Sequence, residues 1–143
     1  MTIIKQLLRW LNSYLFYPEN KKVKNKDAQH LPPIKFNFIN IVERPPKNSD
    51  VKKDSIYLVT KGQNHKWVLF QCPCGCGHVI TLSLQLTHSP HWKITKNSSQ
   101  RPTLYPSVWQ DTSCCSHFWL KDGRIYWCQD TGTPPSQSIN QKE

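Results

Sequence analysis

Three cysteines lie within the six-residue stretch CPCGCG at positions 72–77, and three more follow downstream. Thiolates that converge on one point are favoured ligands of Zn²⁺, and a tetrahedral structural site needs four ligands. Glycine permits a tight turn, so one short segment can aim several sulfur atoms at one ion with little chain to order. We therefore predict a structural zinc site in which this knuckle is clipped to a distant part of the chain.

The ligand set stays open at the level of sequence. The candidate metal ligands are Cys72, Cys74, Cys76, Cys114, Cys115 and Cys128, with His78 and His117 as possible replacements for a sulfur. Adjacent Cys114 and Cys115 cannot both join one tetrahedral site comfortably, and Cys128 competes with them if one knuckle thiol is unused. Buried free thiols, redox-active thiols and, in an oxidising compartment, disulfides are the alternatives to a metal site.

A second group of chemically capable residues lies between positions 106 and 118. Ser107 is a candidate nucleophile and His117 a candidate general base that takes the hydroxyl proton and later returns it to the leaving group. Ser116 or a backbone carbonyl is a candidate to orient the histidine, since carboxylates nearby are few, Asp111 being one. Consecutive strand residues face opposite ways, which places Ser116 poorly for a hydrogen bond to His117 itself. An ordinary satisfied histidine, or a metal ligand, is the competing interpretation.

The elements that must position these residues are predicted to be strands. Alternation of apolar and polar residues, together with aromatic and β-branched content, predicts strands at 34–38, 56–60, 66–70, 80–84, 92–95, 103–105, 118–120 and 124–127. Asp122-Gly123 is a strong hairpin signal, and residues 61–65 form a connection of hairpin size. We therefore predict a mainly β fold, a small antiparallel sheet in which the cysteine knuckle is the turn between two strands.

The predicted β domain covers residues 32–129. An amphipathic helix is expected at 1–17, ended by Pro18, then a basic linker at 18–31; the polar segment 130–143 is expected to be a disordered tail. The helix is too short to span a bilayer, which requires about 20 apolar residues. It is expected to dock on its own domain, on a partner, or at a membrane surface.

Length and charge narrow the choice of function. A chain of 143 residues is enough for one domain plus tails, and its formal net charge of +10 raises the possibility of an anionic partner. Lysines gather in two apolar-poor segments, at 21–26 and 47–53, where a solvated linker is the simpler interpretation, so a nucleic-acid partner is not favoured. The start of the chain lacks the layout of a signal peptide, which favours a cytoplasmic protein.

Several motifs in order resemble one bacterial family, domain of unknown function 6527. The motifs are CPCGCG at 72–77, Trp92, PSVW at 106–109, CxSHF at 114–118 and GRIxWC at 123–128. The likeness covers about residues 34–129. It implies a small zinc-binding protein, with some members encoded beside bacterial ubiquitin-like conjugation components and some acting as proteases on the C-terminus of a ubiquitin-like protein through a serine.

By position, the resemblance implies Ser107, His117 and Ser116 as catalytic residues, and Cys72, Cys74, Cys76 and Cys114 as the preferred metal set. The sequence thus leads to two functional hypotheses. The first is a zinc-stabilised serine hydrolase that processes or deconjugates a ubiquitin-like protein. The second is a non-catalytic zinc-binding module that holds a protein or nucleic-acid partner.

Overall fold

The computed structural model describes residues 30–138, and the fold described here is that of the unit that begins at Pro32. The helix expected at 1–17, and nearly all of the linker expected at 18–31, lie outside the described residues. Within the described part of the chain, no helix is long and apolar enough to cross a membrane. The elements are β1 (Phe38–Val42), η1 (Asn48–Asp50), β2 (Ser55–Lys61), β3 (Asn64–Gln71), β4 (Val79–Ser83), β5 (Lys93–Lys96), β6 (Pro102–Tyr105), β7 (Val108–Trp109), β8 (His117–Lys121), β9 (Arg124–Trp127) and α2 (Pro135–Ser138).

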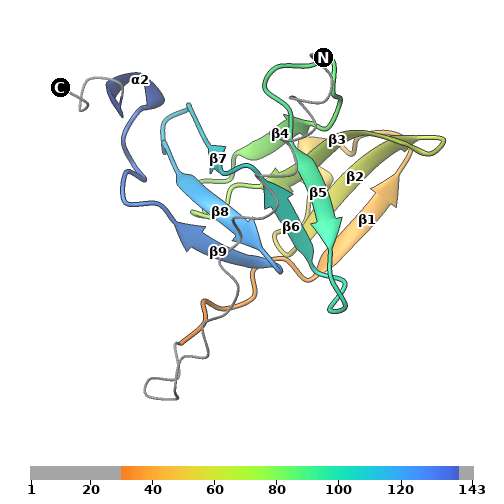
Figure 1. The fold of residues 1–143 in the computed structure, drawn as a ribbon, viewed down its shortest axis with the longest axis horizontal. Helices are drawn as coiled ribbons and strands as arrows, with labels where there is room; N and C mark the ends of the chain where they lie inside the picture. Colours follow the sequence, from red (N-terminus) through yellow and green to blue (C-terminus); the bar gives the residue numbers. More distant parts are fainter. Residues whose placement is uncertain (1–29, 139–143) are drawn as a thin grey trace, which may run out of the picture. The chain divides into compact units, whose positions relative to one another are not determined.

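The strands form three small sheets, which confirms the mainly β prediction. The sheet orders are β1-β2-β3-β4, β5-β6 and β7-β8-β9, and β5-β6 runs between the other two in Figure 1. The expected purely antiparallel pairing is wrong at one edge, because β1 pairs with β2 in parallel. The strand expected at 34–38 is also displaced. β1 starts at Phe38, and Ile34 makes only an isolated bridge to Arg124.

Two predicted turns behave as their residues indicate. β8 and β9 are joined by Asp122 and Gly123, both with positive φ, at 50° and 72°. Two consecutive positive φ angles are the mark of the tight turn that matches the twist of a hairpin. The cysteine knuckle joins antiparallel β3 and β4, so three of the six cysteines lie on or beside one turn, as expected.

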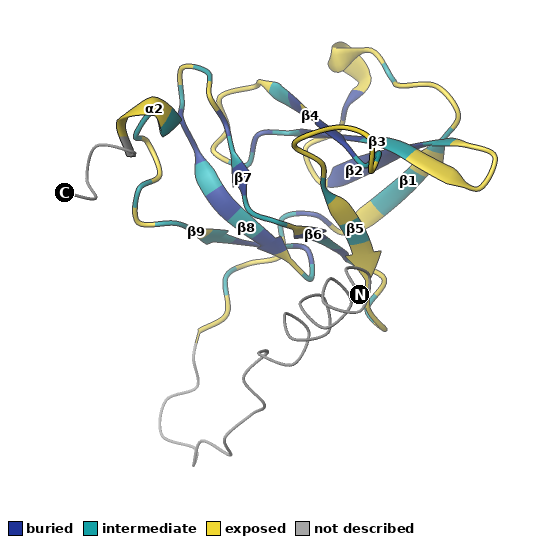
Figure 2. Ribbon diagram, turned by 45° about the horizontal axis from the view of Figure 1, so that its top comes forward, coloured by how far each residue is buried: buried dark blue, intermediate teal, exposed yellow. Residues whose placement is uncertain are grey.

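The main core joins residues of all three sheets. Phe70 of β3 packs edge-on against Phe36 and Phe118, with ring centroids 5.4 and 6.4 Å apart, and Leu104 of β6 is buried in the same cluster. Figure 2 shows the dark blue buried segments along β2, β3, β4 and β8. Because β8 contributes Phe118 and Leu120 to this core, the strand that carries His117 is firmly anchored.

Position 123 requires glycine because the backbone of Phe36 passes too close to leave room for a side chain. A Cβ at this position would lie 2.3 Å from the Phe36 carbonyl oxygen, and φ is positive as well. We expect Gly123→Ala to lower the free energy of unfolding by about 2 kcal/mol or more in a urea titration. Gly62→Ala is the matched control, since Gly62 also has positive φ but no described atom within 4 Å of the added Cβ. Equal losses in the two variants would contradict the predicted backbone clash.

Candidate active site and metal centre

Ser107 and His117 come together through the short strand β7, which was not predicted. Trp109 of β7 pairs with His117 of β8, and Ser107 lies two residues before Trp109. Residues i and i+2 share one face of an extended chain, so Ser107 becomes a diagonal neighbour of His117. The His117 Nε2 atom lies 3.1 Å from the Ser107 Oγ atom, a hydrogen-bond distance.

Asp130 occupies the other side of the histidine. Its Oδ1 atom lies 2.6 Å from His117 Nδ1, a short contact of the kind formed by charge-assisted hydrogen bonds. The His117 side chain is 14% exposed and the Asp130 side chain 41% exposed. A serine hydroxyl, an imidazole and a carboxylate are therefore connected in a single line of hydrogen bonds, which allows the imidazole to act as a base towards the serine.

The segment that carries Asp130 was expected to be disordered, and in the structure it is held by hydrogen bonds. The Gly132 amide donates to the Cys115 carbonyl at 2.9 Å, and Trp109 Nε1 donates to the Thr133 carbonyl at 3.1 Å. The His117 amide donates to Thr131 Oγ1 at 3.0 Å. These bonds tie the segment to β7 and to the start of β8 with little apolar burial, which is why its polar composition was misleading.

Two tryptophans support the serine and the histidine. The Trp109 ring stacks on the His117 ring, with centroids 4.2 Å apart and planes 2° from parallel. Trp92 Nε1 donates a hydrogen bond of 3.2 Å to the Ser107 carbonyl. The stacking restricts motion of the His117 ring, and the hydrogen bond restricts motion of the backbone at Ser107. Neither tryptophan was assigned this role from the sequence, although both lie in the motifs quoted above.

Four cysteines form a separate cluster. The sulfur atoms of Cys72, Cys74, Cys76 and Cys114 all lie within 4.8 Å of one another, so this group could hold a metal ion. Cys72 Sγ is 3.4 Å from Cys74 Sγ and 3.8 Å from Cys114 Sγ. A tetrahedral site with metal–sulfur bonds of about 2.3 Å has sulfur–sulfur edges of about 3.8 Å. The donor set and its spacing therefore fit a tetrahedral thiolate site.

The environment shifts the pKa values of the cluster's thiols in different directions. Burial raises the pKa of Cys72 well above its ordinary value, and it opposes ionisation of Cys74 too. At Cys74, however, hydrogen bonds from the Ser116 hydroxyl, the Cys76 amide and neighbouring thiols outweigh burial and lower the pKa to about 7. At Cys76 the His78 amide lowers the pKa, but desolvation and hydrogen bonding with Cys74 and Cys114 outweigh it, so the pKa is raised.

The structure separates Ser116 from the serine–histidine pair. Ser116 is 3% exposed, and its hydroxyl interacts with Cys72 and Cys74 rather than lying in the line from Ser107 to Asp130. The neighbouring amide of Gln110 is also buried, and its Nε2 atom has no hydrogen-bond partner within the described chain. Ser116 thus lies beside the cysteine cluster, and Asp130, in place of Ser116 or Asp111, lies against the histidine.

The two other cysteines do not join the cluster. Cys115 is buried, and its Sγ donates to the Thr112 carbonyl at 3.1 Å. Cys128 lies with His117 and Asp130 in a second group. Burial, and then the charge of Asp130, raise the pKa of the Cys128 thiol. A raised pKa lowers the fraction of thiolate, so this environment does not favour Cys128 as a nucleophile.

The cysteine cluster and the serine–histidine pair share one connection. Cys114 lies in the segment between β7 and β8, and His117 follows it by three residues. The contact between Cys72 Sγ and Cys114 Sγ therefore constrains the segment that leads directly into His117. This arrangement links the stability of the cluster to the geometry of the histidine.

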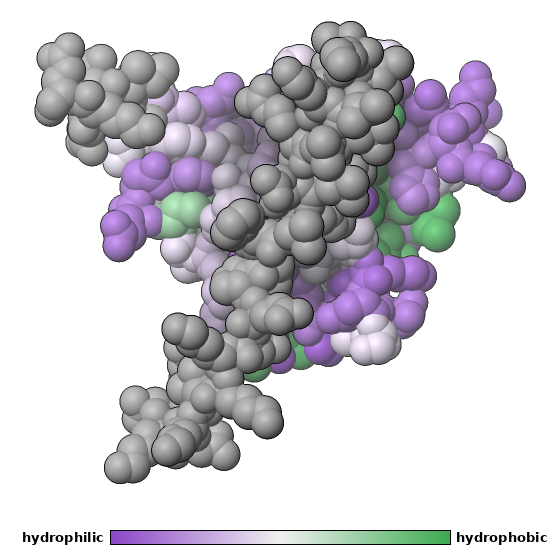
Figure 3. Space-filling view, viewed as in Figure 1, coloured by the Kyte–Doolittle hydropathy of each residue, from purple (hydrophilic) through white to green (hydrophobic). Residues whose placement is uncertain are grey.

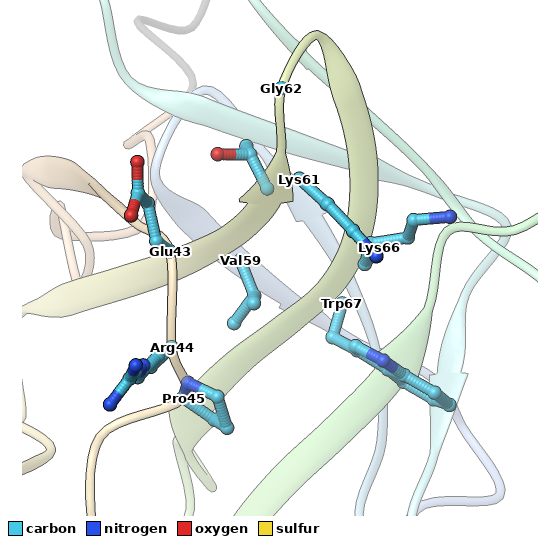
Figure 4. Close-up of a pocket in the computed structure, with 9 residues that line it drawn as sticks. Glu43, Arg44, Pro45, Val59, Lys61, Gly62, Lys66 and Trp67 are labelled. Atoms are coloured by element: carbon cyan, nitrogen blue, oxygen red, sulfur yellow. The ribbon is translucent and has the colours of Figure 1, made fainter.

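A surface groove lies elsewhere, on the sheet that contains β2 and β3. Its volume is about 510 Å³, and its lining includes Arg44, Lys61, Lys66 and Trp67 (Figure 4). No residue of the Ser107–His117–Asp130 line and no cysteine borders it. On the face shown in Figure 3, purple hydrophilic residues predominate among the coloured atoms and green hydrophobic residues form smaller patches.

A serine, a histidine and an aspartate hydrogen-bonded in this order are the arrangement of serine hydrolases. Comparison with family models agrees. The model of the bacterial ubiquitination-like system serine protease (BubE) matches residues 41–128, more than half of the chain, and the chain belongs to that family. This match confirms the association with bacterial ubiquitin-like conjugation that the motifs predicted. Searches of curated proteins and of solved structures gave no match.

Proposed function

We propose that this protein is a zinc-stabilised serine peptidase that processes or deconjugates a ubiquitin-like protein, with Ser107, His117 and Asp130 as its catalytic triad. The observation that carries the proposal is the continuous line of hydrogen bonds, 3.1 Å from Ser107 to His117 and 2.6 Å from His117 to Asp130. The family's description as a serine protease of a ubiquitination-like system supports both the reaction and the class of substrate.

In the acylation step, Ser107 Oγ attacks the carbonyl carbon of the scissile bond. His117 Nε2 accepts the hydroxyl proton as the new carbon–oxygen bond forms. The same nitrogen then gives the proton to the departing amine when the carbon–nitrogen bond breaks. The amine is an α-amino group if a C-terminal extension is removed, and a lysine side chain if a conjugate is cleaved. Water, activated by His117, hydrolyses the acyl-enzyme and regenerates Ser107.

Asp130 acts through the histidine. Its carboxylate accepts the Nδ1–H hydrogen bond, which leaves the Nε2 lone pair directed at Ser107, and it stabilises the imidazolium that forms during each proton transfer. The stacked ring of Trp109 holds the imidazole plane in the orientation that both hydrogen bonds require. Ser116, which the family resemblance implied as a catalytic residue, is assigned to the cysteine cluster instead.

Zinc is assigned to Cys72, Cys74, Cys76 and Cys114, whose sulfur spacing fits tetrahedral coordination. Four protein ligands leave no open position for substrate, so the ion supplies a crosslink and no chemistry of hydrolysis. Ser116 would then donate its hydroxyl hydrogen to a ligating sulfur, a contact that orients and stabilises such ligands. The crosslink holds the β3–β4 turn against the segment that precedes His117.

Asp130→Asn tests the role of the carboxylate. The amide keeps the shape but favours the wrong imidazole tautomer, so we expect kcat to fall by about three to four orders of magnitude. The assay is cleavage of a bacterial ubiquitin-like protein that carries a short C-terminal extension. Asp111→Asn is the matched control, since Asp111 is an exposed acidic residue of the β7–β8 connection. Equal rates for Asp130→Asn and wild type would remove Asp130 from the mechanism.

A further inference from the structure

A second group of potential metal ligands overlaps the proposed triad. One ligand atom each from His117, Cys128 and Asp130 lies within 4.8 Å of the others, and all three residues are half-buried. Cys128 comes directly after β9, and its amide donates a 2.9 Å hydrogen bond to the His117 carbonyl. That backbone bond fixes the position of Cys128 beside the histidine. No residue of this group belongs to the four-cysteine cluster.

A thiolate, an imidazole and a carboxylate together are a ligand set that suits Zn²⁺. Three protein ligands with a fourth position left to water match the stoichiometry of open zinc sites, whereas the four-cysteine cluster is closed. We propose that His117, Cys128 and Asp130 bind a second zinc ion reversibly and that this ion inhibits the peptidase. The metal site stands on these three residues alone, and its inhibitory effect rests on the proposed function.

Inhibition follows from which groups the ion occupies. Two of the three ligands are the residues that relay the proton of Ser107. If the ion took Nδ1, it would replace the 2.6 Å hydrogen bond to Asp130, and the one proton of the neutral imidazole would sit on Nε2, which then could not accept the proton of Ser107. If it took Nε2, it would occupy the lone pair that faces Ser107. Binding exchanges the Cys128 thiol proton for the metal, and the proton goes to solvent. No oxidant or reductant is required.

Cys128 is the one residue of this metal-binding group that does not belong to the proposed triad. A histidine and a single carboxylate hold zinc weakly, and the thiolate supplies the strongest of the three bonds. Cys128 takes no part in the hydrogen-bond line from Ser107 to Asp130. The hydrolytic steps therefore give its thiol no role, whereas metal binding does.

Zinc stoichiometry tests the site without any assay of activity. Full-length protein is equilibrated with a zinc buffer at low micromolar free Zn²⁺, separated from free metal, and measured by elemental analysis. We expect about two zinc ions in wild type and about one in Cys128→Ala. Cys115→Ala is the matched control, since Cys115 lies in neither ligand group, and it should retain two. Two zinc ions in Cys128→Ala, or one in wild type, would overturn the site.

A second arm tests inhibition. Cleavage of the extended ubiquitin-like protein is followed against free Zn²⁺, each variant being compared with its own rate without added metal. Half-inhibition of Cys128→Ala should require at least about tenfold more zinc than that of wild type. Equal sensitivity, or a filled second site in an uninhibited wild type, would overturn the inhibitory role. Absence of serine-dependent cleavage in every sample would refute the peptidase, while the stoichiometry would still decide the metal site.

Discussion

Replacement of Ser107 by alanine is expected to reduce cleavage of the ubiquitin-like substrate by at least about four orders of magnitude. The Oγ atom of Ser107 forms the bond to the acyl group, so its removal leaves no route through a covalent intermediate. Ser107 is only half-buried and does not belong to either hydrophobic core cluster of the described residues. We therefore expect the urea midpoint of Ser107→Ala to stay close to that of wild type, which separates a chemical defect from a folding defect.

Ser113→Ala is the matched control for this experiment. Ser113 is an exposed serine in the connection between β7 and β8, near the site but outside the hydrogen-bond line. The Ser113→Ala variant should cleave the ubiquitin-like substrate at the wild-type rate. If Ser107→Ala also cleaves at that rate, Ser107 is not the nucleophile and the proposed mechanism fails. If both variants lose activity together, the loss in Ser107→Ala is not specific to the proposed nucleophile.

Loss of the cysteine cluster is expected to have the largest effect on stability. Protein purified under reducing conditions should contain a zinc ion in this cluster that withstands dialysis against low free zinc, and Cys74→Ser and Cys114→Ser should each lose it. The crosslink joins the β3–β4 turn to the segment before His117, and metal-binding free energy is folding free energy when the site does not exist in the unfolded chain. We expect a loss of several kcal/mol, a large part of the 5–15 kcal/mol typical of a domain.

Cys115→Ser provides the comparison for the cluster. Cys115 is adjacent to Cys114 but lies outside the cluster, and a serine hydroxyl can keep its hydrogen bond to the Thr112 carbonyl. It should retain zinc and lose much less stability than Cys114→Ser, as judged by elemental analysis and thermal unfolding. Full stability of Cys74→Ser and Cys114→Ser without metal would show that hydrophobic burial alone maintains the fold, and would reduce the cluster to a set of free thiols.

Local features of the sequence were sufficient for much of the fold. The strands β4, β8 and β9 follow from an alternation of buried and more exposed side chains, whereas β2 and β3 follow from continuous runs of β-branched, aromatic and other apolar residues that are buried on both faces of the sheet. Gly123 after Asp122 marks the β8–β9 turn through its positive φ. The spacing of Cys72, Cys74 and Cys76 indicated a converging group of sulfurs, because neighbours on a short turn cannot be far apart. Such features depend on residues that are close in sequence.

The tertiary structure alone decided how the candidate site is assembled. β7 spans only Val108–Trp109, too short for any periodicity, yet it brings Ser107 beside His117. Asp130 lies in a polar segment that buries almost no apolar surface, and long-range hydrogen bonds to β7 and β8 hold it. The parallel pairing of β1 and the choice of Cys114 over Cys115 also depend on distant partners. Composition and spacing report which side chains can bury or bind, whereas the packing of separate strands determines which of them meet.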